Sequence, residues 1–371
     1  MKIVDQGTIF DNPEGHPNRT SACFPAIEML ADGRLLASCQ VGPSKNSAAS
    51  ELLFFESFDE GKTWQPIDVN FNWAYQGVPG RPAAGHLAEI SPGRLLMTVL
   101  WVDRSDPDAP FFHPETEGLL PVKMLLTESA DGGYTWSDFR EIDSSPFIQA
   151  TPTGPIIPLA EGTLIAPFEV NKEYLDPGPW LQKAGVVFSY DGGYTWKDAR
   201  VAAHDSTREL FYWDQRHALL PDGTILVIFW TYNNVSGRDI DLHWAVSNDS
   251  GKTWTKPAPT GIAGQASVPV ALGGSDVLLL SVHRYEPPCL RALLSHDGGR
   301  TWDEESALVF YEKPMPAIPP ADRTADYLQE MGLWTFGLPT GRLLPNGDVF
   351  CVYYAGDAEQ TGIYWVRIAL P

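Results

Sequence analysis

The chain has 371 residues, of which 43% are hydrophobic, so it holds enough apolar material for a sizeable core. Its formal net charge is −21, from 47 acidic and 26 basic side chains. An acidic chain of this kind is not expected to bind nucleic acid or an anionic membrane, because both partners require a basic surface.

The predicted elements begin with a strand over residues 2–10. A pattern of apolar strand, Gly-containing tight turn and second apolar strand then repeats six times along the chain. The six repeats are residues 24–41, 83–101, 153–170, 214–232, 267–284 and 338–356.

A second repeat, Ser-x-Asp-x-Gly-x-Thr-Trp, occurs five times, and we call each copy an Asp box. The boxes are residues 57–64, 129–136, 189–196, 247–254 and 295–302. The Ser and Asp side chains favour a turn, Gly supplies the positive φ, and Trp covers the turn, so we interpret the box aspartates as structural. A calcium loop is excluded because the boxes lack the further oxygen ligands and the bidentate Glu of an EF-hand.

These repeats predict one all-β domain over residues 1–371, a six-bladed β-propeller of four-stranded antiparallel blades. Each of the first five strand pairs continues into a strand that enters an Asp box and a short strand that follows it. The sixth unit ends without its fourth strand. We therefore expect residues 2–10 to complete that blade and close the ring.

Hairpin parity separates the two faces of this propeller. The Asp boxes and the Gly-containing turns lie on one face, which we call the box face. The long loops lie on the other, the loop face, where a short helix is predicted at 321–332; these loops are residues 102–123, 169–183, 232–243, 283–291 and 312–334. Because long loops on a rigid scaffold carry function, the site is expected at the centre of the loop face.

Asp boxes on six four-stranded blades resemble the sialidase (neuraminidase) superfamily, and the resemblance covers essentially the whole chain. It implies a site with three arginines, a Tyr activated by a Glu, and an Asp acid/base. Most of these positions are not matched: Cys23 stands where the first arginine belongs, and Phe336 lies near the expected Tyr. Asp214 occupies the Glu position, while Arg284 or Arg291 matches the third arginine.

The fourth repeat supplies the central catalytic candidates. Residues two apart on a strand share a side, so Tyr212, Asp214 and Arg216 are expected to face the same channel, with His86 at the level of Arg216. Such a set suits acid/base chemistry and anion binding. The competing interpretations are a structural ion pair between Asp214 and Arg216, and a histidine that only packs in the core.

Further polar and aromatic residues are predicted on the loop face. Several cations on an otherwise acidic chain suggest a carboxylated sugar as the ligand. The polar candidates are Arg19, Arg81, Glu169, Glu209, His283, Arg284 and Tyr285, and the candidate sugar-stacking residues are Trp101, Trp180, Trp230 and Trp334.

The sequence therefore favours a sialidase-like glycoside hydrolase acting on an anionic sugar. Asp214 with Tyr212 or Glu209 would act as nucleophile or acid/base, and Arg216 with Arg284 would hold the carboxylate. A lyase would instead use Tyr212 or His86 to abstract a proton, and a carbohydrate-binding propeller without catalysis is the third alternative.

No cofactor or metal motif was found, and the four cysteines lack metal-ligand spacing. No segment is apolar enough for a signal peptide or a membrane span, so a cytoplasmic location is expected.

Overall fold

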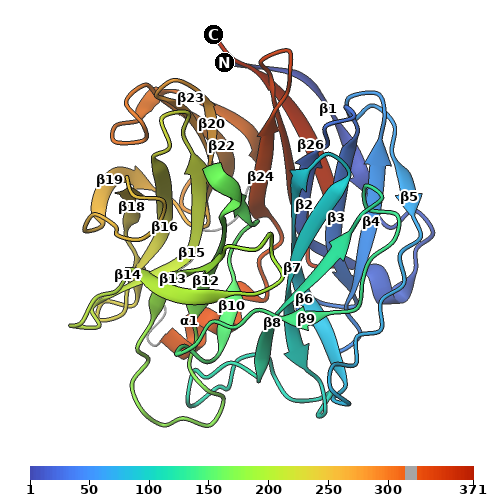
Figure 1. The fold of residues 1–371 in the computed structure, drawn as a ribbon, viewed down its shortest axis with the longest axis vertical. Helices are drawn as coiled ribbons and strands as arrows, with labels where there is room; N and C mark the ends of the chain where they lie inside the picture. The colour runs from blue at the N-terminus through green and yellow to red at the C-terminus, as the bar shows by residue number, and fades with distance from the viewer. Residues whose placement is uncertain (314–323) are drawn as a thin grey trace.

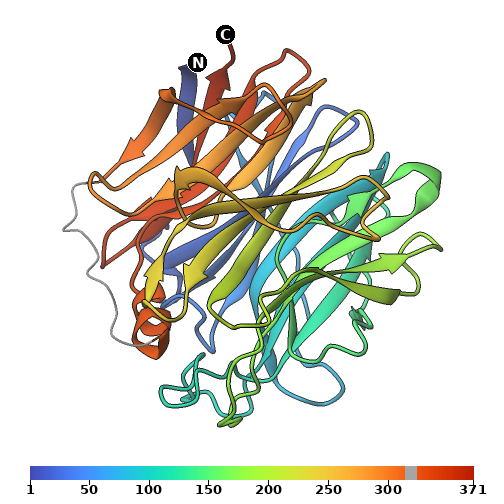
Figure 2. The ribbon, with the colours of Figure 1, turned by 90° about the vertical axis from the view of Figure 1, so that its left-hand side faces the viewer.

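The computed structural model describes residues 1–313 and 324–371. Small antiparallel sheets make up most of this structure and are arranged as a propeller, as the two perpendicular views show (Figures 1 and 2). None of the described helices is long and apolar enough to cross a bilayer. The prediction of an all-β propeller is confirmed.

The first three groups of strands follow the chain in order. The first holds β2 (Ser21–Met29), β3 (Leu35–Gly42), β4 (Glu51–Ser57) and β5 (Gln65–Ile67). The second holds β6 (Gly80–Ser91), β7 (Arg94–Asp103), β8 (Val122–Ser129) and β9 (Arg140–Glu141). The third holds β10 (Ala150–Pro152), β11 (Ile157–Pro158), β12 (Leu164–Val170), β13 (Lys183–Ser189) and β14 (Lys197–Ala203).

The remaining groups complete the ring. The fourth holds β15 (Leu210–Leu219), β16 (Ile225–Asn233), β17 (Arg238–Asp239), β18 (Asp241–Ser247) and β19 (Ala258–Ala263). The fifth holds β20 (Val268–Gly273), β21 (Asp276–His283), β22 (Cys289–Ser295) and β23 (Asp303–Glu312). The sixth holds β24 (Gly337–Leu343), β25 (Val349–Gly356), β26 (Thr361–Ala369) and β1 (Lys2–Phe10).

Hydrogen bonding joins the first and sixth groups into one eight-stranded sheet, so the six groups of strands form five separate hydrogen-bonded sheets. The joint is a single parallel pairing of Ser21 with Thr361. The N-terminal strand β1 pairs antiparallel with β26, from Lys2 opposite Ala369 to Phe10 opposite Ile363. The prediction that the N-terminal strand completes the last group is confirmed, and both chain ends lie together in Figure 1.

The Asp boxes form the turns that the sequence predicts. In the second box, Ser129 Oγ donates to Asp131 Oδ1 at 2.8 Å and accepts from the backbone N–H of Gly133, also at 2.8 Å. Gly133 has a φ of 100°, and Trp136 Nε1 donates to its carbonyl oxygen at 3.0 Å. The box aspartates therefore stabilise their own turns, as predicted.

Three inner strands share, at the same level, a β-bulge that contains a non-glycine residue with positive φ, and β6 also shifts register at this level, between Pro82 and Ala84. The pairing register shifts between Cys23 and Ala26, between Trp213 and Arg216, and between Gly337 and Thr340. Within these bulges, Phe24, Asp214 and Leu338 have φ values of 50°, 46° and 45°. A bulge places an extra residue on one strand and changes which side chains share a side.

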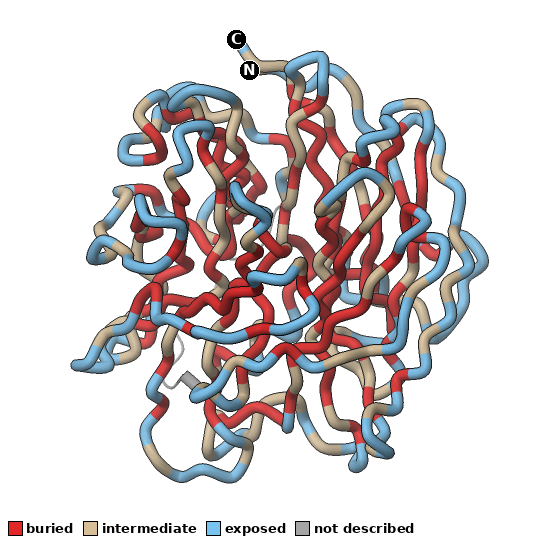
Figure 3. The backbone as a smooth tube through the Cα atoms, viewed as in Figure 1, coloured by how far each residue is buried: buried red, intermediate tan, exposed pale blue. Residues whose placement is uncertain are grey.

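The core lies between neighbouring groups of strands, where the tube in Figure 3 is mostly buried. All four cysteines are free and buried. Two short 3₁₀ segments, Pro17–Arg19 and Ala160–Gly162, and the helix α1 (Thr324–Met331) interrupt the β-structure. The helix confirms the prediction for 321–332 in part, since residues 321–323 lie outside the described residues.

Candidate active site

A cavity of about 360 Å³ opens among the ends of the inner strands on the loop face. Its walls come from the inner strands β2, β6, β10, β15 and β24, from the second strands β7, β12, β16 and β25, from the loops between second and third strands, and from α1 and the residues that follow it. Residues that line it include Phe24, Lys45, His86, Phe112, Glu169, Trp180, Trp213, Asp214, Arg216, Trp230, Arg284 and Trp334. The cavity lies where the sequence predicts the site.

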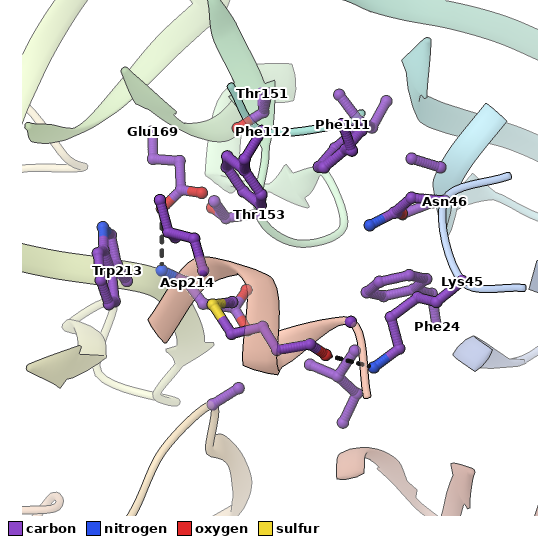
Figure 4. Close-up of a pocket in the computed structure, with 18 of the residues that line it drawn as sticks. Phe24, Lys45, Asn46, Phe111, Phe112, Thr151, Thr153, Glu169, Trp213 and Asp214 are labelled. Atoms are coloured by element: carbon purple, nitrogen blue, oxygen red, sulfur yellow. Dashed lines mark hydrogen bonds between the residues drawn. The ribbon is translucent and has the colours of Figure 1, made fainter. Parts of the chain in front are cut away.

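Two carboxyl groups from neighbouring strand groups meet on one wall of this cavity (Figure 4). Glu169 lies near the end of β12, and its Oε2 accepts a hydrogen bond from the backbone N–H of Asp214 at 3.1 Å. The Asp214 Oδ1 is 2.6 Å from Nη2 of Arg216. The bulge in β15 thus presents both the N–H and the carboxylate of Asp214 to the site.

Burial changes the ionisation of these groups. It raises the pKa of Glu169 from 4.5 to about 7, with a further contribution from the negative charge of Asp214. Burial also raises the pKa of Asp214, while the Arg216 guanidinium opposes that shift. Glu169 can therefore hold and release a proton near neutral pH, the property of a general acid/base.

His86 and Arg216 both reach the cavity, as the strand alignment predicts. Burial lowers the pKa of His86 to about 3, and the positive charge of Arg216 adds to this effect. His86 is therefore neutral in the working range of pH. It offers the site a hydrogen-bonding group and no positive charge.

Aromatic rings form one wall of the cavity. Trp213 lies 5.3 Å from Trp230 and 5.9 Å from Trp180, and Trp230 lies 5.7 Å from Trp334, measured between ring centroids. Apolar rings beside a few converging polar groups are typical of small-ligand sites. Three of the predicted sugar-stacking residues line the cavity. The fourth, Trp101, is buried in the core, where its Nε1 donates to the carbonyl of Trp73 at 2.8 Å.

Lys45 and Arg284, which also line the cavity, make hydrogen bonds to other protein groups. Lys45 Nζ donates to the carbonyl oxygens of Met331 and Trp334 at 2.9 and 3.1 Å. Arg284 donates to Gln265 and to the carbonyl of Phe336, and its guanidinium lies 3.9 Å from the Trp334 ring centroid. Arg284 therefore supports the aromatic wall as well as lining the cavity.

The prediction that Tyr212 shares a side with Asp214 is wrong. The bulge between Trp213 and Arg216 interrupts the alternation, so Tyr212 points into the core, where its ring lies 5.3 Å from that of Phe229. Trp213 faces the cavity in its place.

Five other predicted residues do not line the cavity. Glu209 is exposed and accepts from Asn233, Arg19 pairs with Glu51 at 3.8 Å, and Arg81 donates to the carbonyl of Ala48. His283 contacts the carbonyl of Pro287 at 3.3 Å, and Tyr285 donates its hydroxyl to Asp239 at 2.8 Å. Each of these side chains is directed toward a protein partner or solvent and not into the cavity.

Sequence reasoning also missed residues that line the cavity, among them Phe24, Lys45, Phe112 and Trp213. Lys45 lies in the loop after the second strand of the first group, so a cation in that loop was a usable signal. Phe24 and Trp213 gave no such signal, because their direction depends on the bulges.

Comparisons with known proteins agree with this fold. Residues 103–314 match the family model of the BNR repeat-like domain. A sialidase of Bacteroides fragilis (strain YCH46) is 25% identical over 328 residues, covering 80% of this chain and 57% of the relative. The chain thus spans little more than half the length of that sialidase.

Solved structures share the fold at lower identity. A protein of unknown function from Dyadobacter fermentans gives a TM-score of 0.75 at 19% identity, covering 100% of this chain and 99% of that one. The Hadza microbial sialidase gives a TM-score of 0.69 at 16% identity, covering 98% of this chain and 68% of that one. An α-L-arabinanase of Penicillium chrysogenum complexed with arabinobiose gives 0.66 at 15%, covering 99% and 98%.

Proposed function

Because this chain belongs to the family of proteins with a BNR repeat-like domain, we propose that it is a glycoside hydrolase that uses Glu169 and Asp214. The proposal takes the scaffold to be a six-bladed propeller. The eight-stranded sheet supports this count, because a single pairing of Ser21 with Thr361 joins two complete groups of strands.

One observation carries the proposal. Two carboxyl groups lie in one aromatic cavity, joined by the bond from the Asp214 N–H to Glu169, and their surroundings differ. Burial raises the pKa of Glu169 to about 7. Burial also raises the pKa of Asp214, but the Arg216 guanidinium opposes that shift by stabilising the ionised form. A protonated and an ionised carboxyl group side by side are the two parts that glycoside hydrolysis requires.

In this proposal, Glu169 donates its proton to the glycosidic oxygen as the bond to the anomeric carbon breaks. Asp214 remains negative beside Arg216 and either attacks the anomeric carbon or activates the water that does. The Trp213 ring, on the same strand, packs against the sugar. The names of the sialidase and arabinanase relatives support a carbohydrate substrate.

An anionic sugar remains part of the proposal. The guanidinium of Arg216 lines the cavity, and its described polar contact is the ion pair of Nη2 with Asp214, which leaves its other nitrogens without a described partner. We therefore assign the contact with a substrate carboxylate to Arg216. Arg284, which the sequence also suggested for this role, makes bonds to Gln265 and Phe336 and is a weaker candidate.

The lyase alternative has less support. Of the two bases it would use, Tyr212 lies outside the cavity, and His86, with a pKa of about 3, is a weak base. Binding without catalysis is an outcome that the experiment below distinguishes.

The test is a screen of methylumbelliferyl glycosides and natural oligosaccharides, both neutral and carboxylated, with wild type, Glu169→Gln and Asp214→Asn. A matched control is Glu173→Gln, four residues further along the chain and exposed. We expect each site variant to lower kcat about 10³-fold on any glycoside that wild type cleaves, and the control to match wild type. Full activity in both site variants would refute the assignment. Ultraviolet absorbance of an unsaturated product would indicate a lyase, and binding without turnover a lectin-like protein.

A further inference from the structure

A single carboxylate behind the aromatic wall accepts hydrogen bonds from four side chains. Asp239, in β17, does not line the cavity. Its Oδ1 accepts from Trp230 Nε1 at 2.6 Å. Its Oδ2 accepts from Gln265 at 2.7 Å, from the Tyr285 hydroxyl at 2.8 Å and from the Tyr327 hydroxyl at 2.5 Å. An ionised carboxylate has room for about four such donors and donates none itself.

Two of these donors connect Asp239 to the wall of the cavity. Trp230 lines the cavity, and the bond from its indole nitrogen fixes the rotation of its ring. Tyr327 lies in α1, and the next residue of that helix, Leu328, lines the cavity. The Tyr327 ring stacks on Trp213 with centroids 6.1 Å apart and planes 16° apart. Asp239 therefore holds α1 and two tryptophans in one arrangement.

A third donor, Gln265, makes hydrogen bonds to both Asp239 and Arg284 and so links the two residues. Because a carboxylate only accepts, the amide group of Gln265 must turn its NH₂ toward Asp239. Its carbonyl oxygen then faces Arg284 and accepts a hydrogen bond from that guanidinium. Arg284 in turn lies over the ring of Trp334, another residue of the wall.

We propose that Asp239 is a positioning residue that sets the aromatic wall and Arg284, and so determines how tightly a sugar binds. The inference rests on the proposed function, because it assigns sugar binding to this wall. Asp239 does not touch the cavity, so it acts through Trp230, Tyr327 and Gln265. None of its four described hydrogen bonds goes to Glu169 or Asp214, so the effect is expected on sugar binding and not on the carboxyl pair.

The test compares Asp239→Asn with Asp241→Asn. Asparagine has nearly the same shape as aspartate, but its NH₂ would meet the side-chain donors. Asp241 lies two residues away and accepts only from the backbone N–H of Gly261 at 2.9 Å among the hydrogen bonds described, away from the cavity. We expect Asp239→Asn to raise KM about tenfold for the glycoside that wild type cleaves best, with kcat within about twofold, and Asp241→Asn to match wild type.

A second measurement does not depend on activity. Near-ultraviolet circular dichroism reports the tryptophan environment, and hydrogen exchange reports the amides of α1. We expect Asp239→Asn to change the dichroism and to speed exchange in α1 at least tenfold relative to Asp241→Asn. Unchanged spectra and exchange would overturn the inference, as would a fall in kcat without a rise in KM.

The two proposals fail in different ways. If wild type cleaves no glycoside, the proposed function fails, while dichroism and exchange still decide whether Asp239 sets the wall. Should Asp239→Asn not fold, Tyr285→Phe and Tyr327→Phe each remove one donor and keep the carboxylate. A raised KM with unchanged kcat in these variants supports the inference, and wild-type KM values in both overturn it.

Discussion

Carboxyl groups on the box face and in the cavity have pKa values shifted in opposite directions, although both kinds of group lie near the ends of strands. Hydrogen bonds from Thr195 lower the pKa of Asp191, in the third Asp box, to about 2. Burial and the neighbouring charge of Asp214 raise the pKa of Glu169 to about 7. The same chemical group thus stabilises a turn at one face and can hold a proton at the other.

The difference follows from donors and solvent. Asp191 is exposed, and its two oxygens accept from the Thr195 N–H at 2.9 Å, the Thr195 hydroxyl at 2.6 Å and the Ser189 hydroxyl at 2.9 Å. Glu169 is only partly exposed to water and has a negative neighbour. Donors and water favour the ionised form, whereas burial beside a negative charge favours the protonated form.

The largest expected effect separates the two faces by activity. Asp214→Asn removes the negative charge at the site, and we expect kcat to fall about 10³-fold. Asp191→Asn weakens one box turn, so it should lower the melting temperature and leave kcat unchanged. Steady-state kinetics and thermal unfolding on both variants check this. A large loss of kcat in Asp191→Asn would contradict the division of roles.

The second prediction concerns pH. If Glu169 acts as the acid, kcat/KM should fall as pH rises above about 7, and Glu169→Gln should lack this limb. Stability should follow the same group. Between 4.5 and about 7 the folded state binds a proton that the unfolded state has lost, so stability falls by up to about 3 kcal/mol as pH rises.

The unfolding free energy of Glu169→Gln minus that of wild type should therefore be larger at pH 8 than at pH 4. Urea unfolding at the two pH values measures this. An identical pH dependence of stability in wild type and variant would show that the pKa of Glu169 is not raised in the folded state.

A smaller effect is expected from the hydroxyl of an Asp box. Ser129→Ala leaves the buried N–H of Gly133 without its acceptor, which should cost about 1–3 kcal/mol of unfolding free energy. Turnover of any glycoside that wild type cleaves should not change at low temperature. Ser236→Ala, at an exposed loop position, is the control, and equal unfolding curves for the two variants would count against this account of the boxes.

The smallest expected effect tests the bulge. Tyr212 packs against Phe229 in the core, so Tyr212→Phe should alter kcat and KM by less than about twofold. Steady-state kinetics on the same glycoside suffice. A loss comparable to that of Asp214→Asn would mean that Tyr212 reaches the substrate after all.

Much of the fold was readable from local signals. The Asp boxes, the Gly-containing turns and the unpaired strand at residues 2–10 predicted the groups of strands and the pairing of β1 with β26. The placement of Asp214, Arg216 and His86 in one cavity was also predicted, because the repeats align the inner strands.

Two causes account for the site residues that were mispredicted. Alternation along a strand assumes a regular ladder, and the bulge at Asp214 exchanges Tyr212 for Trp213. Glu209 and Tyr285 were placed on the correct face, but their side chains turn to Asn233 and Asp239. Loop residues have several possible partners, and the sequence does not rank them.

The sequence by itself determined the repeating turns, the all-β propeller and the face on which the cavity opens, because these follow from the repeats along the chain. Only the tertiary structure decided that Glu169 holds a proton near neutral pH and that Asp239 gathers Trp230, Gln265, Tyr285 and Tyr327. Burial and hydrogen bonding between groups distant in sequence set both properties, and they arise only when the strands and loops have closed around the cavity.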